Sequence, residues 1–321
     1  MRFQTRHFSL TITNLLVWGV LLGSGCNTER VEPAALQLSS GKDVVDATGR
    51  NWEGIAKVWY YRPPNAADSL QAVMVIHGGG RDGEDYLESW IPIAEAYGLL
   101  VIAPEFSDER LIGFVGSVSK AGFEYRFNTG NVVSWFSRDT REQDWYFTSI
   151  ERVFEATRRA EPRTRSRYVL FGHSAGGQFV HRMALFTPRP RFAVAIAANS
   201  GWYTLPDMEM SFPYGLSGAP YPDDRLAAAL KRTVIVFLGT EDSPDDGGFR
   251  TRPEAMEQGQ SRQERGVRFY NHARRVASSQ GVPLGWELAY AEGIGHDKAR
   301  MAKAAVPLLQ QRGLLQSPGR P

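Results

Sequence analysis

Residues 168–186 read YVLFGHSAGGQFVHRMALF. An apolar run at 168–171 leads into a G-x-S-x-G pattern centred on Ser174, and a helix-compatible run leads out of it. Glycines on either side of a serine permit the unfavourable backbone angles of a sharp strand-to-helix turn. Such a turn exposes the hydroxyl above the sheet and sets the positive end of the helix under any developing negative charge. The pattern therefore predicts that Ser174 is a nucleophile.

The rest of the chain alternates apolar runs with helical spacing. Apolar runs typical of buried parallel strands occupy 72–76, 99–103, 168–171, 193–197, 233–238 and 286–290, after an early strand that ends at Arg62. Helices are expected at 84–97, 148–160, 175–186, 224–231, 266–279 and 298–312. This alternation predicts an α/β fold with a mostly parallel sheet and helices on both faces. We expect one catalytic domain over 51–312 and a flexible tail over 313–321.

Composition limits the classes of partner. Of the 321 residues, 42% are hydrophobic and 22% are charged, which fits a globular protein. The net charge is only +2, so the chain lacks the basic surplus that a nucleic-acid partner would require. No nucleic-acid partner is expected.

The amino terminus predicts export. Residues 1–25 have a basic start, a short apolar stretch and small residues, as in a secretory signal peptide. Cys26, the single cysteine of the chain, follows directly. The segment resembles a bacterial lipoprotein signal, which implies that Cys26 is lipidated as the first mature residue and anchors the protein to a membrane of the cell envelope. Residues 27–50 would form a tether; the alternative is an ordinary signal peptide that leaves a free thiol.

A serine nucleophile needs a base and an acid that orients the base. Among six histidines, His296 lies in a glycine-flanked loop after the last predicted strand and is the expected base. The acid is expected after the preceding strand, where Asp242 is the first choice and Asp245 and Asp246 are alternatives.

A second glycine motif, His77-Gly78-Gly79-Gly80, follows the strand at 72–76. It matches an oxyanion motif of lipases and esterases. We expect the N–H of Gly79 or Gly80 to supply one oxyanion donor and the N–H of Ala175 to supply the other.

Two aromatic segments, 105–147 and 201–223, interrupt the alternation after strand ends, where ligands bind in open α/β sheets. One interpretation is a substrate-binding rim that includes Trp202 and Tyr203. The alternative is a self-packed loop that shields the core.

Together these motifs resemble the α/β-hydrolase superfamily over roughly residues 50–312. The H-G-G and G-H-S-A-G-G motifs are most similar to its secreted esterase branch, which includes polyhydroxybutyrate-depolymerase-like and feruloyl-esterase-like proteins. The resemblance implies a serine esterase without metal or cofactor that acts on a small-molecule or oligomeric ester. An amidase or peptidase with the same residues, or a catalytically idle binding protein, are the alternatives.

Overall fold

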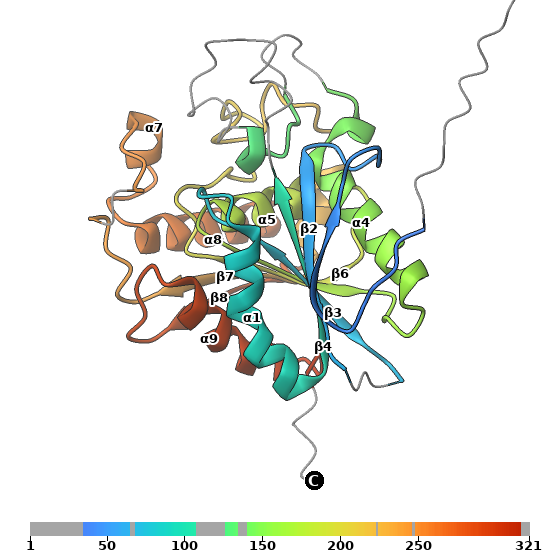
Figure 1. Ribbon diagram of the computed structural model, residues 1–321. Helices are drawn as coiled ribbons and strands as arrows, with labels where there is room; N and C mark the ends of the chain where they lie inside the picture. The colour runs from blue at the N-terminus through green and yellow to red at the C-terminus, as the bar shows by residue number, and fades with distance from the viewer. Residues whose placement is uncertain are drawn as a thin grey trace, which may run out of the picture. The chain divides into compact units, whose positions relative to one another are not determined.

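The computed structural model describes residues 35–64, 68–106, 126–133, 140–222, 224–245 and 248–315. Within these residues the chain forms an eight-stranded sheet of order β1-β2-β4-β3-β5-β6-β7-β8 (Figure 1). The strands are β1 Gly41–Asp46, β2 Ile55–Arg62, β3 Gln71–Ile76, β4 Leu99–Phe106, β5 Tyr168–His173, β6 Phe192–Ala198, β7 Val234–Gly239 and β8 Trp286–Ala291.

The sheet is mostly parallel, as the sequence predicts. All neighbouring pairs from β4 to β8 run parallel, whereas β1 pairs antiparallel with β2 and β2 antiparallel with β4. The parallel strands therefore end at one edge, and the loops that leave this edge can bring distant residues together.

Helices cover both faces of the sheet. They are α1 Gly83–Tyr97, α4 Tyr146–Ala160, α5 Ala175–Phe186, α6 Arg225–Leu230, α7 Pro253–Met256, α8 Arg262–Ser279 and α9 Lys298–Gln310, with a 3-10 turn at Glu142–Asp144. Helices α1 and α9 pack together in the core layer of one face (Figure 1). Helices α4, α5, α6 and α8 contribute to the layer of the other face. The predicted α/β fold, with a mostly parallel sheet and helices on both faces, is thus confirmed.

Strand β3 shows why its sequence is a continuous apolar run. Met74 and Ile76 belong to one core layer, and Val73 and Val75 to the other. Successive side chains of a strand point to opposite faces, so a strand covered on both sides needs an apolar residue at every position. The same pattern makes β3 recognisable from sequence.

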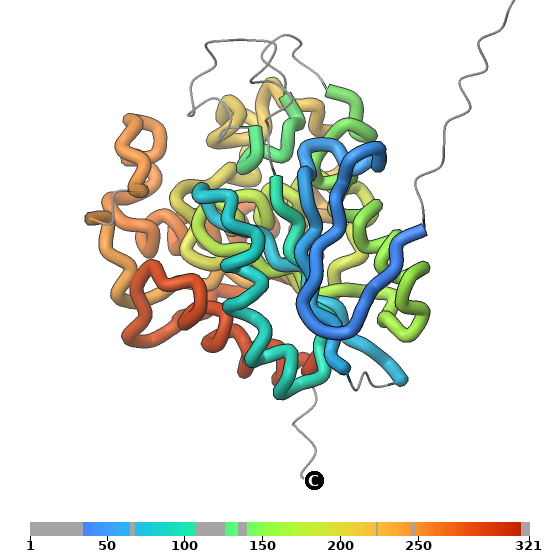
Figure 2. Tube along the Cα trace, in the orientation of Figure 1, coloured from blue at the N-terminus to red at the C-terminus, as the bar shows by residue number. Residues whose placement is uncertain are grey.

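The boundaries of the domain need two corrections. Strand β1 lies inside the predicted tether 27–50 and pairs with β2 along its length (Figure 2), so the folded domain begins before residue 51. It was missed because an exposed edge strand with charged residues lacks an apolar pattern. At the other end, Leu315 is buried against the layer of α1 and α9, so the predicted tail 313–321 begins within folded structure.

Several predicted features lie outside the described residues. These are the signal peptide, Cys26, and the parts 107–125 and 134–139 of the first aromatic segment. Within the described ranges, none of the helices has the length and apolar character needed to cross a membrane.

Candidate active site

Ser174 sits at the turn between β5 and α5 with φ 59° and ψ −119°. This conformation is costly for a residue with a side chain, by about 1–3 kcal/mol. The flanking glycines make the turn possible because neighbouring backbone atoms lie too close to them to leave room for a side chain. A Cβ on Gly172 would lie 2.3 Å from the Gly176 carbonyl oxygen, and a Cβ on Gly176 would lie 2.2 Å from the Ile76 carbonyl oxygen.

The loops after β7 and β8 bring Asp242 and His296 together. His296 Nδ1 lies 2.9 Å from Asp242 Oδ2. Asn199, at the end of β6, links the two loops: its side chain accepts from Gly239 N at 2.7 Å and donates to the Gly295 carbonyl at 3.1 Å. Asn199 lies in no motif that predicts this role, and its positive φ of 44° marks the end of β6 as another tight turn.

The other candidates for acid and base lie elsewhere. Asp245 is exposed and accepts a hydrogen bond from Ser243 Oγ at 3.2 Å, and Asp246 lies outside the described residues. His272, on α8, faces Asp207 at 3.4 Å. The structure thus brings Asp242, the first choice of the sequence analysis, to His296.

Ser174 and His296 line one hollow of about 530 Å³. Its lining joins the glycine motif, the serine turn and the start of α9: Gly78, Gly79, Gly80, Asp82, Tyr86, His173, Ser174, His296, Asp297, Lys298 and Ala299. Nucleophile and base candidates therefore face a space in which a substrate can bind.

His77 orients the glycine motif. Its ring is fully buried, and burial lowers the pKa of His77 to about 4, so the ring is neutral near pH 7. Nε2 accepts a hydrogen bond from Phe106 N at 3.0 Å. The single proton of the neutral ring is therefore on Nδ1, which donates to the Gly78 carbonyl at 2.8 Å.

This hydrogen bond determines where Gly79 points. In a planar trans peptide the N–H of one residue points away from the carbonyl of the residue before it. The Gly79 N–H is therefore turned to the side opposite His77. A Cβ at Gly79 would meet nothing within 4 Å, and Gly79 lines the hollow of Ser174, so a substrate can approach the backbone closely at this residue. Of the two predicted glycines, the geometry favours Gly79 as a donor, while Gly80 lines the same hollow.

Ala175 is the first residue of α5. The first N–H groups of a helix have no partner within the helix and carry partial positive charge. The position of Ala175 beside Ser174 is therefore compatible with the predicted role of its N–H as an oxyanion donor.

His173 adds an aromatic contact that the sequence analysis did not use. Its ring centroid lies 4.5 Å from that of His296, and its Nδ1 lies 3.1 Å from Tyr86 Oη. Burial lowers the pKa of His173 well below its usual value, so it is a neutral neighbour of the candidate base.

Arg262 is a further residue that was missed. Its Nη1 donates to Asp242 Oδ1 at 2.9 Å, on the carboxylate edge that His296 does not use. No sequence signal pointed to it, since Arg262 is 20 residues from Asp242 in the chain and lies on a different element.

The predicted substrate rim of Trp202 and Tyr203 is wrong for both residues. Trp202 is only 2% exposed, and the guanidinium of Arg182 lies 4.0 Å from its ring centroid. Tyr203 is fully buried and stacks on Phe269 with ring centroids 4.5 Å apart. Neither lines the hollow of Ser174, so the structure supports the alternative of a self-packed segment.

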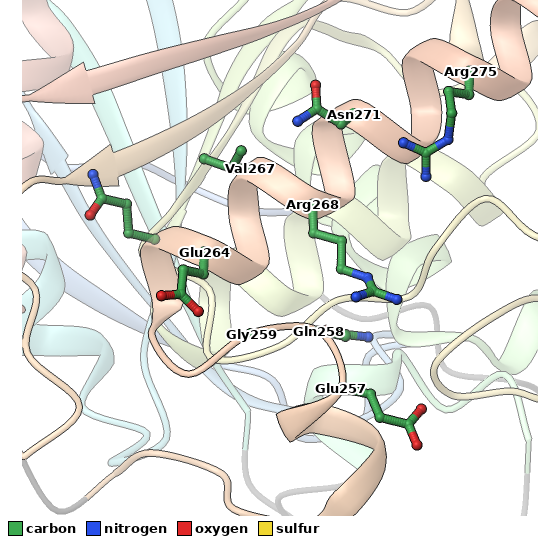
Figure 3. A pocket seen from close by; sticks show the side chains of 9 residues that line it. Glu257, Gln258, Gly259, Glu264, Val267, Arg268, Asn271 and Arg275 are labelled. Atoms are coloured by element: carbon green, nitrogen blue, oxygen red, sulfur yellow. The ribbon is translucent and has the colours of Figure 1, made fainter.

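A second hollow of about 610 Å³ runs along α8 (Figure 3). Its lining includes the polar side chains of Glu257, Arg268, Asn271 and Arg275, and it contains neither Ser174 nor His296. Within the described ranges, no group of three or more His, Cys, Asp or Glu side chains is placed to hold a metal ion.

The chain is similar to several hydrolases of known structure. Poly(aspartic acid) hydrolase-1 from Sphingomonas sp. KT-1 is 36% identical, with 85% of this chain and 100% of that chain covered at a TM-score of 0.76. The poly(3-hydroxybutyrate) depolymerase LpqC from Bordetella parapertussis is 32% identical, with 87% and 92% covered at a TM-score of 0.75. An S-formylglutathione hydrolase from Agrobacterium tumefaciens shares the fold at 16% identity, with 87% and 98% covered and a TM-score of 0.53. No protein-family model and no curated protein matches the chain.

Proposed function

Because the chain belongs to the α/β-hydrolase family that includes poly(aspartic acid) hydrolase-1 and the depolymerase LpqC, we propose that it cleaves carboxylic esters through an acyl-enzyme on Ser174. One observation carries the proposal: Ser174, on its strained turn, shares a hollow with His296, and His296 is hydrogen-bonded to Asp242. Neutral serine is a weak nucleophile, and this arrangement supplies a base and a group that orients the base.

In the acylation step, Ser174 Oγ attacks the ester carbonyl carbon while His296 Nε2 accepts the hydroxyl proton. Asp242 holds the Nδ1–H of His296 and stabilises the imidazolium. The carbonyl oxygen becomes an oxyanion, to which the N–H groups of Gly79 and Ala175 would donate. His296 then gives its proton to the departing alkoxide, and the alcohol leaves.

In the deacylation step, water takes the place of the alcohol. His296 accepts one proton from the water as its oxygen attacks the acyl carbon, and the second tetrahedral intermediate uses the same donors. Collapse of this intermediate breaks the bond to Ser174 Oγ, which regains the proton from His296. The products are a carboxylic acid and the free enzyme.

The charges around the hollow favour an uncharged ester. Lys298 is already paired with Asp82 at 2.9 Å and Asp85 at 3.2 Å, and Asp297 adds another carboxylate. A polyanion would meet these carboxylates without an unpaired cation among the described lining residues. This favours small or oligomeric neutral esters.

Amide cleavage is the second candidate. It is favoured by the 36% identity to a protein named as a hydrolase of poly(aspartic acid), whose backbone linkages are amides. Ester and amide hydrolysis pass through the same kind of intermediate, so a matched pair of butyryl substrates, one p-nitrophenyl ester and one p-nitroanilide, separates them. Serine amidases also cleave activated p-nitrophenyl esters, so the anilide decides: ester turnover without anilide turnover supports the proposal, and anilide turnover that is lost in Ser174→Ala replaces it with an amidase.

A fluorophosphonate probe tests the nucleophile directly. We expect one label per chain on Ser174 in the wild type and none in Ser174→Ala, with ester turnover lowered about 10⁴-fold or more in the variant. A folded wild type that neither labels nor hydrolyses esters would identify an idle hydrolase fold used for binding.

We also propose that the protein is exported and attached to a bacterial membrane through lipid on Cys26. The support is the position of the single cysteine after the apolar stretch of the signal. A lipid chain contributes about 0.8 kcal/mol per buried methylene, so several chains give durable attachment. Mass spectrometry of the mature amino terminus decides the matter, because an unmodified chain that begins at another residue contradicts the anchor. Cys26→Ser should release the protein from membranes without changing its turnover of small esters.

A further inference from the structure

The carboxylate of Asp242 is shared between two partners. Oδ2 faces His296 Nδ1 at 2.9 Å, and Oδ1 accepts from Arg262 Nη1 at 2.9 Å. The side chains of Asp242 and Arg262 are each only 1% exposed. We propose that Arg262 is a positioning residue for hydrolysis, which orients Asp242 and reduces the negative charge that His296 experiences. This inference rests on the proposed function, because Arg262 acts through Asp242 in the same site.

The guanidinium fixes more than the carboxylate. Arg262 Nη1 also donates to the carbonyl of Ser243, the residue after Asp242, at 3.0 Å. The start of α8 is itself held in place, because Ser261 Oγ caps the helix by accepting from Glu264 N at 3.1 Å. Arg262 therefore ties the acid loop to a rigid helix end through Nη1, which donates to both Asp242 and Ser243.

The charge of Arg262 has a second consequence. A buried carboxylate stabilises the imidazolium of an adjacent histidine, and a guanidinium on the same carboxylate weakens that effect. Among the described residues, the groups beside His296 include the neutral His173, at 4.5 Å between ring centroids, and Asp297 and Lys298, which line the same hollow. Replacement of Arg262 leaves these groups unchanged. Loss of its charge should therefore make His296 easier to protonate and move the acid limb of the rate profile to higher pH.

Arg265 provides a matched control on the same helix. It is fully buried, and its guanidinium lies 3.9 Å from the ring centroid of Phe249, the ring that Arg262 also approaches. Its hydrogen bonds go instead to the backbone carbonyls of Gly201 at 2.6 Å, Arg250 at 2.8 Å and Gly259 at 2.9 Å, and to Met256 Sδ at 3.2 Å. Arg265 is therefore buried on the same helix as Arg262, but none of these hydrogen bonds goes to Asp242.

The experiment compares Arg262→Gln, Arg262→Lys and Arg265→Gln with the wild type on p-nitrophenyl butyrate. Measured quantities are kcat, KM, the pH profile of kcat/KM and Tm. For Arg262→Gln we expect kcat to fall at least tenfold, KM to change less than threefold, and the acid limb to move up by at least half a pH unit. Arg262→Lys keeps the charge, so its acid limb should stay in place, while kcat falls because the lysine side chain is one bond shorter and does not reach the position of Nη1. Arg265→Gln should lower Tm and leave the acid limb in place.

The outcomes separate this inference from the proposed function. Suppose that the fluorophosphonate probe labels the wild type and the wild type hydrolyses esters. If Arg262→Gln then has the kcat and the acid limb of the wild type, the positioning role is overturned. The positioning role is also overturned if Arg262→Gln and Arg265→Gln both lower Tm and leave kcat and the acid limb unchanged. If Arg262→Gln does not fold, Arg262→Lys decides: a kcat at least tenfold below wild type with unchanged Tm supports the role, and a wild-type kcat overturns it. An inactive, unlabelled wild type instead overturns the proposed function.

Discussion

Lys298 Nζ lies 2.9 Å from Asp82 Oδ2, so the loop that carries His296 is tied to the segment that follows the glycine motif. Lys298 is two residues beyond His296, and Asp82 is two residues beyond Gly80. Asp85 lies 3.2 Å from the same ammonium. One ion pair thus connects the candidate base with the candidate oxyanion donors, across 216 positions of sequence.

We expect Lys298→Met to affect rate more than stability. The paired side chains are about one-third exposed, so the ion pair contributes at most about 1 kcal/mol to folding. Without the ammonium, the carboxylate of Asp82, which lines the hollow, loses its cationic partner and repels the developing oxyanion, which should lower kcat about threefold to tenfold. Steady-state kinetics and thermal unfolding measure both effects. Lys303→Met, an exposed site on the same helix, is the control and should match wild type; an equal effect at both sites would contradict the assignment.

Asp242→Asn should be far more damaging than Asp245→Asn. Only Asp242 contacts the candidate base, at 2.9 Å, whereas Asp245 pairs with Ser243 on the surface. Loss of the orienting carboxylate costs about 10⁴-fold in kcat in the serine protease template. Turnover of p-nitrophenyl butyrate should fall by a similar factor in Asp242→Asn and remain within twofold in Asp245→Asn. The opposite ranking would move the acid along the loop.

His77 should make the fold sensitive to acid. Its pKa is about 4 in the folded chain and close to 6.5 when unfolded, so the unfolded chain binds more protons between these values. The contribution of His77 to the free energy of unfolding is fully present above pH 6.5 and is lost as the pH falls towards 4. The full loss is about 3 kcal/mol.

The variant His77→Gln tests this effect. A glutamine amide can donate to the Gly78 carbonyl and accept from Phe106 N, as His77 does, but it does not titrate. Urea unfolding at several pH values should show that the free energy of unfolding falls less between pH 6.5 and 4 for the variant than for the wild type. Parallel curves would show that His77 does not contribute to acid sensitivity.

The fold could be predicted from sequence because buried parallel strands and covering helices leave clear periodic signals. Every predicted parallel strand is present, and Ser174, Asp242 and His296 follow strand ends as chain order required. Strand β1 could not be predicted, since its GKDVVD sequence is mostly exposed. Arg262 and Asn199 could not be predicted either, because their contacts depend on how α8 and β6 approach the acid loop.

The error at Trp202 has a different cause. An aromatic residue after a strand end can line a cleft or fill a layer, and local sequence does not distinguish the two. The choice depends on Arg182, Arg250 and Tyr214, which lie 4.0, 4.8 and 4.9 Å from the centroid of the ring. Burial of Trp202 is therefore a tertiary effect.

Trp202→Ala should destabilise the protein without changing its choice of ester. Truncation of a buried tryptophan costs about 3–5 kcal/mol, and here it also leaves the guanidinium of Arg182 without its aromatic neighbour. Thermal unfolding should show the loss, and Trp202→Phe should recover part of it. The ratio of kcat/KM for acetyl and octanoyl esters should equal that of wild type. A selective loss for the longer ester would restore Trp202 to the substrate rim.

Charge on the acyl group should decide how well an ester is used. The hollow of Ser174 is lined by Asp82 and Asp297, and its Lys298 is already engaged by two carboxylates. An anionic acyl chain would meet repulsion that is screened by salt. The p-nitrophenyl ester of hexanoic acid and the monoester of adipic acid have the same acyl length and leaving group, and we expect kcat/KM at least tenfold higher for the hexanoate at low salt. The ratio should shrink at 0.5 M NaCl and in Asp297→Asn, in which an amide oxygen can still cap α9. Because both substrates share the same chemical step, changes in the rate of that step cancel in the ratio.

Equal use of the two esters, or a preference for adipate, would show that the hollow accepts anions and would favour a polyanionic substrate.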